Sequence, residues 1–303
     1  MYPLIEIEGF KCSFNMIWVR DDSPFLGEPA KGVVLLVPVF NTSARCWKVW
    51  ERAIYRLDPL PEKVIFCENN STDNTLELIN NFQLPHEVIR VWFKPDASRG
   101  NEYGPIAHVR QLLLTRARTY GAKTAIFLDD DCIPERRDFI KMFLKDNFDI
   151  CGGSYTRDFP NGTLVASLWS IDLPEDNFPK TKSHKKEVEE CKKLEYRVLG
   201  YPYEILEKDG RTKFRCTVTS AGAMALGQKV LQDKRLDFYP LHPELGDKGE
   251  VSEDFGFCLF AGTLGYKVYL DFAIKFAHLG VISIANEPKH RPWVVNEKDT
   301  FEF

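Results

Sequence analysis

Three polar clusters carry most of the side chains that could do chemistry in this chain. Each begins where an apolar run ends, and they are Asn41, Glu68–Asp73 and Asp129–Asp131. Adjacent carboxylates repel each other and raise each other's pKa unless a cation neutralises them. The acidic triplet therefore predicts an oxygen-rich site for Mg²⁺ or Mn²⁺, the ions that usually accompany a diphosphate. Turns and helix caps use the same residue types, so this interpretation requires that the three clusters meet.

A fourth group, Ser252-Glu253-Asp254, precedes an apolar segment in the second half of the chain. Ser252 is a good helix N-cap, which predicts both acids in the first helical turn, where the helix dipole favours ionised carboxylates. These two acids either take part in proton transfer or only satisfy the end of the helix.

The elements before the first three clusters are predicted to form one sheet. The apolar run Val33–Phe40 is typical of a strand that is buried on both faces. Trp47, Trp50, Ile54 and Leu57 recur at helical spacing. The same reasoning predicts strands at 63–67, 88–93 and 124–128, a helix from Ser71, and a helix over Pro105–Tyr120 that Gly121 stops. Alternating strands and helices indicate a mainly parallel sheet, whose ligands bind at the carboxyl ends of the strands.

The second half of the chain is less regular. A strand is expected at Phe148–Tyr155, small and β-branched residues fill 217–226, and the helix from Ser252 should end at Gly265. The segments YKVYL and AIKFAHL predict two closing strands, whereas the stretch Asp21–Gly32 and the basic run Lys180–Lys186 indicate loops. The basic run could alternatively bind phosphate or lipid head groups. We expect a single domain over 1–303, with a nucleotide half at about 33–131, an acceptor half at 132–285 and a tail at 286–303.

Composition excludes several classes of protein. The chain has 303 residues, 44% of them hydrophobic and 28% charged, which rules out a disordered or fibrous chain. The net charge of −4 argues against nucleic-acid binding. The longest apolar run is far shorter than the ~20 residues of a membrane span, and no signal peptide is visible. The 8 cysteines show no Cys-x-x-Cys spacing, so we expect reduced thiols, several of them buried, in a protein that is cytoplasmic or peripheral at a membrane face.

The order of motifs resembles one enzyme family. The motifs are PVFN (38–41), ENNSTDNT (68–75), Arg110, FLDDD (127–131), SEDFGFC (252–258) and LGYKVYLD followed by His278. Together they look like family 2 of the glycosyltransferases, which are nucleotide-sugar enzymes, and the resemblance covers about 33–280. It implies an α/β fold of GT-A type, in which a mainly parallel central sheet is flanked by helices. The first half would be Rossmann-like and bind the nucleotide, and the mixed second half would bind the acceptor.

The resemblance also implies a pocket for the nucleoside. Pro38, Phe40 and Asn41 would line the base and the ribose, and Asp73 belongs to the same group of nucleotide-binding positions. Glu68 stands where the family usually has Asp, whose carboxylate accepts an N–H of the base. The longer side chain leaves open whether that base is uracil or guanine.

The acidic triplet would hold the diphosphate end of the sugar donor. By resemblance, Asp129 holds the ribose or the sugar and helps to bind the metal, Asp131 chelates the metal, and His278 completes the metal site. Asp130 is either a second contact or solvated. Arg110 either neutralises a carboxylate, reaches the phosphates or lies on the surface of its helix.

The implied reaction is transfer of a sugar to a hydroxyl group. Asp254 matches the general base of the inverting members, Glu253 is the next candidate, and Mn²⁺ or Mg²⁺ would stabilise the departing nucleoside diphosphate. The chain is thus expected to be a hexosyltransferase that uses a UDP- or GDP-sugar and a glycan, lipid-linked or protein acceptor. A sugar-phosphate nucleotidyltransferase would need a glycine-rich loop where this chain has PVFNTSARC. A non-catalytic sugar-binding protein of the same fold would lack one of the acids.

Overall fold

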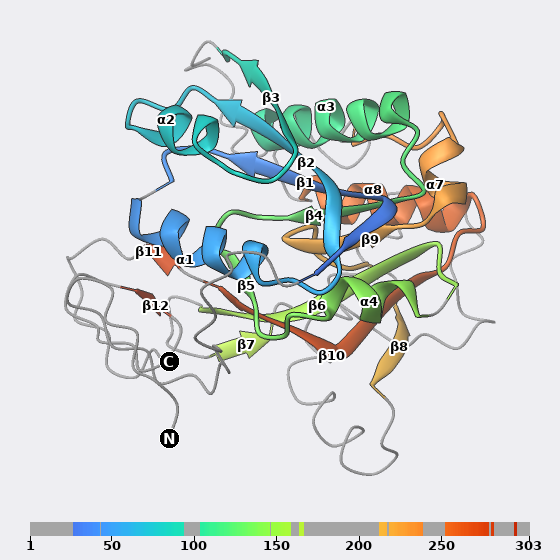
Figure 1. Cartoon of the computed structure of the whole chain (residues 1–303). Helices are drawn as coiled ribbons and strands as arrows, with labels where there is room; N and C mark the ends of the chain where they lie inside the picture. The colour runs from blue at the N-terminus through green and yellow to red at the C-terminus, as the bar shows by residue number, and fades with distance from the viewer. Residues whose placement is uncertain are drawn as a thin grey trace, which may run out of the picture.

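The computed structural model describes residues 27–42, 44–93, 104–145, 147–158, 164–166, 212–216, 218–238, 252–278, 280–281 and 294–295. A 10-stranded sheet runs through it in the order β3-β2-β1-β4-β9-β6-β10-β5, with β7 paired to β6 and β8 to β10 (Figure 1). The strands are β1 (Pro29–Val39), β2 (Leu60–Asn69), β3 (His86–Val91), β4 (Thr124–Leu128), β5 (Cys132–Pro134), β6 (Ile150–Asp158), β7 (Leu164–Ala166), β8 (Lys213–Cys216), β9 (Ala223–Leu226) and β10 (Val268–His278). A separate pair joins β11 (Gly280–Val281) to β12 (Val294–Val295).

The direction of the strands confirms the expected fold class. β1 runs parallel to β2 and β4, β2 to β3, and β6 to β10. Since β9 is antiparallel to both β4 and β6, these two strands also share a direction. The central strands are therefore mainly parallel, with a Rossmann-like half from β3 to β4 and a mixed half beyond it, which is the predicted GT-A type of arrangement. In the described part of the chain, no helix combines the length and the apolar character needed to cross a membrane.

Helices cover both faces of the sheet. They are α1 (Ala44–Tyr55), α2 (Thr75–Asn80), α3 (Gly104–Tyr120), α4 (Phe139–Leu144), α7 (Gln228–Gln232) and α8 (Glu253–Thr263) (Figure 1). The side chains of β1 alternate between the two faces of the sheet. Leu35 and Val37 belong to the core that packs against α1, α2 and α4. Val34 and Leu36 belong to the core that packs against α3, α7 and α8. The strand is thus buried on both faces, as its apolar run predicts.

The structure corrects several of the expected boundaries. YKVYL and AIKFAHL belong to the single strand β10, which has a register shift between Asp271 and Lys275. At this shift the Asp271 carboxylate accepts the N–H of Ala273 at 2.9 Å, which bends the strand without ending it. Residues 29–32, expected in a loop, belong to β1, and the helix expected from Ser71 begins only at Thr75. The short elements β5, α4 and α7 were not predicted.

Two further expectations concern the cysteines and the basic run. The described cysteines are buried and none of them forms a disulfide, in agreement with the expectation of reduced thiols. The basic run Lys180–Lys186 lies outside the described residues.

Candidate functional site

The turns after β1 and β2 are joined to each other. Asn41 and Asn70 have positive φ angles of 46° and 52°, a left-handed conformation that asparagine tolerates better than most residues. The Asn41 side-chain oxygen accepts the N–H of Thr72 at 2.8 Å, and the Asn41 N–H donates to the Ser71 hydroxyl at 3.0 Å. The first two predicted clusters therefore form one hydrogen-bonded unit at the carboxyl end of the sheet.

Thr42 connects this unit to the acidic triplet. Its N–H donates to the Thr75 hydroxyl oxygen at 2.9 Å, and its own hydroxyl donates to the Asp130 carboxylate. Asp73 is exposed, and its carboxylate accepts the N–H of Thr75 at 3.0 Å, so it stabilises the start of α2. All three clusters thus meet at one edge, although nothing in the sequence distinguished Thr42 as the residue that joins them.

The acidic triplet shows the electrostatic strain expected of adjacent carboxylates. Burial, and after it the charge of Asp131, raise the pKa of Asp130 well above its ordinary value, and the Thr42 hydroxyl opposes this shift. Excess negative charge at this position would be relieved by a cation.

Arg110 of α3 links the triplet to the first turn of α8. Its side chain is buried, with 5% of the residue exposed, so the expected alternative of a surface position is wrong. Its Nη2 atom donates to Asp129 Oδ1 at 3.1 Å and to Asp129 Oδ2 at 3.2 Å. Its Nε atom lies 3.2 Å from Glu253 Oε1. One guanidinium therefore holds two acids that are far apart in the sequence.

Asp254 is fixed by three hydrogen-bond donors. Its Oδ2 accepts the N–H of Ala221 at 3.0 Å, and its Oδ1 accepts the N–H of Phe255 at 2.9 Å and the hydroxyl of Ser252. Ser252 does occupy the N-cap position, but its side chain bonds to this carboxylate instead of capping the helix. The carboxylate of Asp254, with 6% of the residue exposed, is thus held in one orientation.

The turn before β9 brings the two halves of the site together. Ala221 donates to Asp254 as described, and the neighbouring Gly222 carbonyl accepts the N–H of Asp129 at 3.0 Å. The backbone of two adjacent residues therefore connects the acid after β4 with the acid that begins α8. The small residues of this segment suggest either close approach of a sugar or a simple bulge, and neither interpretation predicts these contacts, because backbone contacts leave no signature in residue types.

Glu253 differs electrostatically from its neighbour. Burial, opposed by Arg110 and reinforced by the Asp254 charge, raises the pKa of Glu253 from 4.5 to about 7. A carboxyl group that titrates near neutral pH is well suited to exchanging a proton. The two adjacent acids are thus distinct: Asp254 is held by three donors, whereas Glu253 is paired with Arg110 and titrates near pH 7.

The fit of a divalent cation depends on the acids of the triplet. In the described part of the chain, no three His, Cys, Asp or Glu side chains lie together as a metal cluster. The backbone of His278 in β10 is paired with that of Cys132, directly after Asp131, but its side chain lies outside the description. Mg²⁺ is commonly held by one or two carboxylates together with substrate phosphates, so the oxygen atoms present suit a cation that arrives with a diphosphate.

The predicted base pocket differs from the expectation at Glu68. Glu68 is 1% exposed, its Oε1 accepts the N–H of Ser71 at 2.6 Å, and its Oε2 accepts from Arg90 Nε at 3.1 Å. Pro38 is buried within β1, whereas Phe40 is 58% exposed just beyond it. Arg90 was not predicted, although a charged residue in the apolar segment 88–93 is a signal that could have indicated it.

Comparison with known proteins gives distant structural likenesses. No family model and no curated protein matches the sequence. S. aureus TarS 1–349 in complex with UDP is similar at a TM-score of 0.48 and 13% identity, over 80% of this chain and 59% of that one. The mannosyltransferase PcManGT from Pyrobaculum calidifontis, in complex with GDP-Man and Mn²⁺, is similar at a TM-score of 0.46 and 16% identity, over 85% of this chain and 60% of that one. The chain spans 36% of the length of S. aureus TarS.

Proposed function

We propose that this protein is a metal-dependent glycosyltransferase that moves a sugar from a nucleoside-diphosphate sugar to a hydroxyl acceptor with inversion. The observation that supports this most directly is the bridge that Arg110 makes between Asp129 and Glu253. The bridge links Asp129, which would hold the sugar donor, to the helical turn whose acids would activate an acceptor. A buried arginine with two carboxylates at the ligand-binding edge of an α/β sheet is an arrangement that such a reaction can use.

On the sugar-donor side, Asp129 would hold the ribose or the sugar and Asp131 would bind the cation, with His278 as a further ligand. Mn²⁺ or Mg²⁺, when bound, would stabilise the negative charge of the departing diphosphate. Asp130, held by Thr42, would keep the triplet in place. Arg110 would keep Asp129 oriented towards the site.

On the acceptor side, Asp254 would be the general base and Glu253 the next candidate. The base takes the proton of the attacking hydroxyl while the new C–O bond forms at the anomeric carbon. The bond from that carbon to the diphosphate breaks, and its electron pair leaves with the nucleoside diphosphate. The three hydrogen bonds to Asp254 would hold its carboxylate ready for this role.

The proposal also includes a compartment and a class of acceptor. The enzyme would act in the cytoplasm or at a membrane face, on a glycan, lipid-linked or protein acceptor. Residues at about 33–131 would bind the nucleotide and those at 132–285 the acceptor, within one domain.

The test is turnover of a panel of UDP- and GDP-hexoses in the presence of Mn²⁺, with release of nucleoside diphosphate as the readout. We expect release that requires the cation and increases with a suitable acceptor. Release of pyrophosphate from a nucleoside triphosphate and a sugar phosphate would instead indicate a nucleotidyltransferase. Binding of the sugar donor without any turnover across the panel would indicate a non-catalytic protein.

A further inference from the structure

Two exposed aromatic side chains stand at the carboxyl end of the sheet. Phe40 directly follows β1 and Trp92 directly follows β3, and they are 58% and 68% exposed. The next most exposed large apolar residue in the described part of the chain is Leu144, at 40%. Aromatic faces in this location offer a flat surface on which a nucleobase can stack.

An ion pair between the buried Glu68 and the exposed Arg90 lies in the strands that lead to these aromatic residues. The strand register places Glu68 beside Val39 of β1 on one side and beside Arg90 of β3 on the other. The Glu68 carboxylate is buried and accepts hydrogen bonds from the Ser71 N–H and from Arg90 Nε. Each oxygen atom of Glu68 thus accepts one hydrogen bond from the protein, and at 1% exposure the carboxylate presents almost no surface to a ligand.

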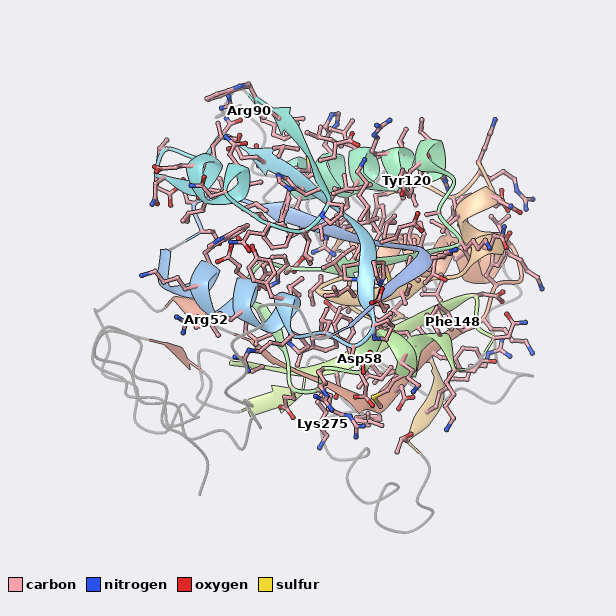
Figure 2. The ribbon with its side chains drawn as sticks, viewed as in Figure 1. Arg52, Asp58, Arg90, Tyr120, Phe148 and Lys275 are labelled. Atoms are coloured by element: carbon pink, nitrogen blue, oxygen red, sulfur yellow. The ribbon has the colours of Figure 1, made fainter. Side chains whose placement is uncertain are left out.

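Arg90 presents a charged group to solvent at this part of the edge. Its side chain is 45% exposed, its guanidinium carbon lies 5.6 Å from the centre of the Trp92 ring, and Figure 2 shows it at the outer end of β3. Only its Nε is bonded to Glu68, and its terminal nitrogens make no hydrogen bond to any residue that the structure describes. The pair with Glu68 and the contact with Trp92 hold the guanidinium in place from two sides.

We propose that Arg90, rather than Glu68, reads the base of the nucleoside diphosphate, and that this base is guanine or uracil. The inference rests on the proposed function, because it specifies the sugar donor of the same site. A guanidinium only donates hydrogen bonds, so it needs a carbonyl oxygen or ring nitrogen opposite it. Guanine offers O6 and N7 to both terminal nitrogens, and uracil offers O4. Adenine and cytosine carry an amino group at the corresponding position, which would face the donors of Arg90 without a partner.

In this arrangement Glu68 is a positioning residue. It acts through Arg90, whose guanidinium it holds by a hydrogen bond to Nε. Trp92 and Phe40 would stack on any base, so they add affinity without selecting among bases.

The experiment is calorimetric titration of GDP, UDP, ADP and CDP in Mn²⁺, using the wild type and Arg90→Met. Wild type should bind GDP or UDP at least 10-fold more tightly than ADP and CDP, since one well-formed base contact gives about 10- to 100-fold discrimination. Arg90→Met should remove most of this preference by weakening the favoured nucleotide alone. Trp92→Ala should instead weaken all four nucleotides by a similar factor. The matched control is Arg116→Met, which removes an arginine of α3 that pairs with Glu87 of β3. This variant should change neither the affinity for nucleotides nor the preference among them.

The variants also separate the possible failures. Removing Arg90 alone leaves Glu68 buried without its cation, so the double variant Arg90→Met, Glu68→Gln keeps the test valid if the single variant does not fold. Glu68→Gln alone should reduce the preference less than Arg90→Met. Equal loss for all four nucleotides in Arg90→Met, or an unchanged preference, would overturn the role of Arg90. No binding of any nucleoside diphosphate to wild type would overturn the proposed function itself.

Discussion

Replacing Glu253 by glutamine should make the protein more stable at alkaline pH. Because the pKa of Glu253 rises from 4.5 to about 7 on folding, the folded protein binds this proton more tightly than the unfolded chain. The stabilisation that comes from this tighter proton binding by Glu253 is fully present below pH ~4.5 and is lost as the pH rises through about 7. Relative to strongly acid pH, the free energy of unfolding is therefore lower by roughly 3 kcal/mol at pH 8 and by about 1 kcal/mol at pH 5. Glutamine avoids this cost and keeps an oxygen atom beside the Arg110 guanidinium.

The measurement is the thermal unfolding midpoint of wild type and Glu253→Gln at pH 5 and pH 8. We expect the variant to unfold several degrees higher at pH 8, with a much smaller gap at pH 5, since 1 kcal/mol is worth ~2–4 °C in a large domain. Asp254→Asn is the matched control from the same helical turn. Its new amide would face the three donors that the carboxylate satisfies, so it should lower the midpoint. A Glu253→Gln variant less stable than wild type at pH 8 would show that Arg110 outweighs the cost of burial, and the reasoning would be wrong.

Three further predictions concern the proposed reaction. Asp131→Asn should fold normally, because the residue lies at a strand end, but should weaken binding of UDP or GDP in Mn²⁺; equal affinities by calorimetry would remove Asp131 from the metal site. Asp254→Asn should lower kcat by ~10²–10⁴-fold with little change in affinity for the sugar donor, and a variant that keeps more than about a third of wild-type turnover would exclude it as the base. His278→Ala should weaken Mn²⁺ more than Mg²⁺ and flatten the fall in metal affinity at acid pH, because nitrogen ligands favour the later ion and must be neutral to bind. An unchanged ratio of the two affinities would mean that His278 is not a ligand.

The core of the fold could be predicted from the sequence because periodicity is a local property. The run that forms β1 is continuously apolar, and α3 begins next to a proline and is followed by Gly121 at φ 81°. Such signals are carried by neighbouring residues and need no knowledge of the rest of the chain. The sequence predicts two strands where β10 is one, because Asp271, the polar residue at its register shift, is a residue type that commonly starts a turn.

The site was predictable in outline for a different reason. Parallel strands bring their carboxyl ends together, so polar residues after β1, β2 and β4 had to meet. Which side chains pair at that edge depends on the direction in which each side chain points, and the sequence does not specify this direction. Arg110 had three possible roles until its contacts with Asp129 and Glu253 were known. The sequence predicts that Glu68 faces a ligand, yet Glu68 lies opposite Arg90 of the next strand and its carboxylate pairs with that arginine.

The energetics of Arg110 argue that its two carboxylates are kept for chemistry rather than for stability. The guanidinium and Glu253 are both buried, and removing two charges from water costs more than an exposed ion pair returns. A single positive charge faces two acids. Burial is the main cause of the raised pKa of Glu253, and Arg110 opposes this shift without cancelling it. Apolar residues of similar size would make a more stable interior at this position. Residues that lower stability and lie at the ligand-binding edge of the sheet are those expected to act on a substrate, since activity commonly requires groups held in unfavourable surroundings.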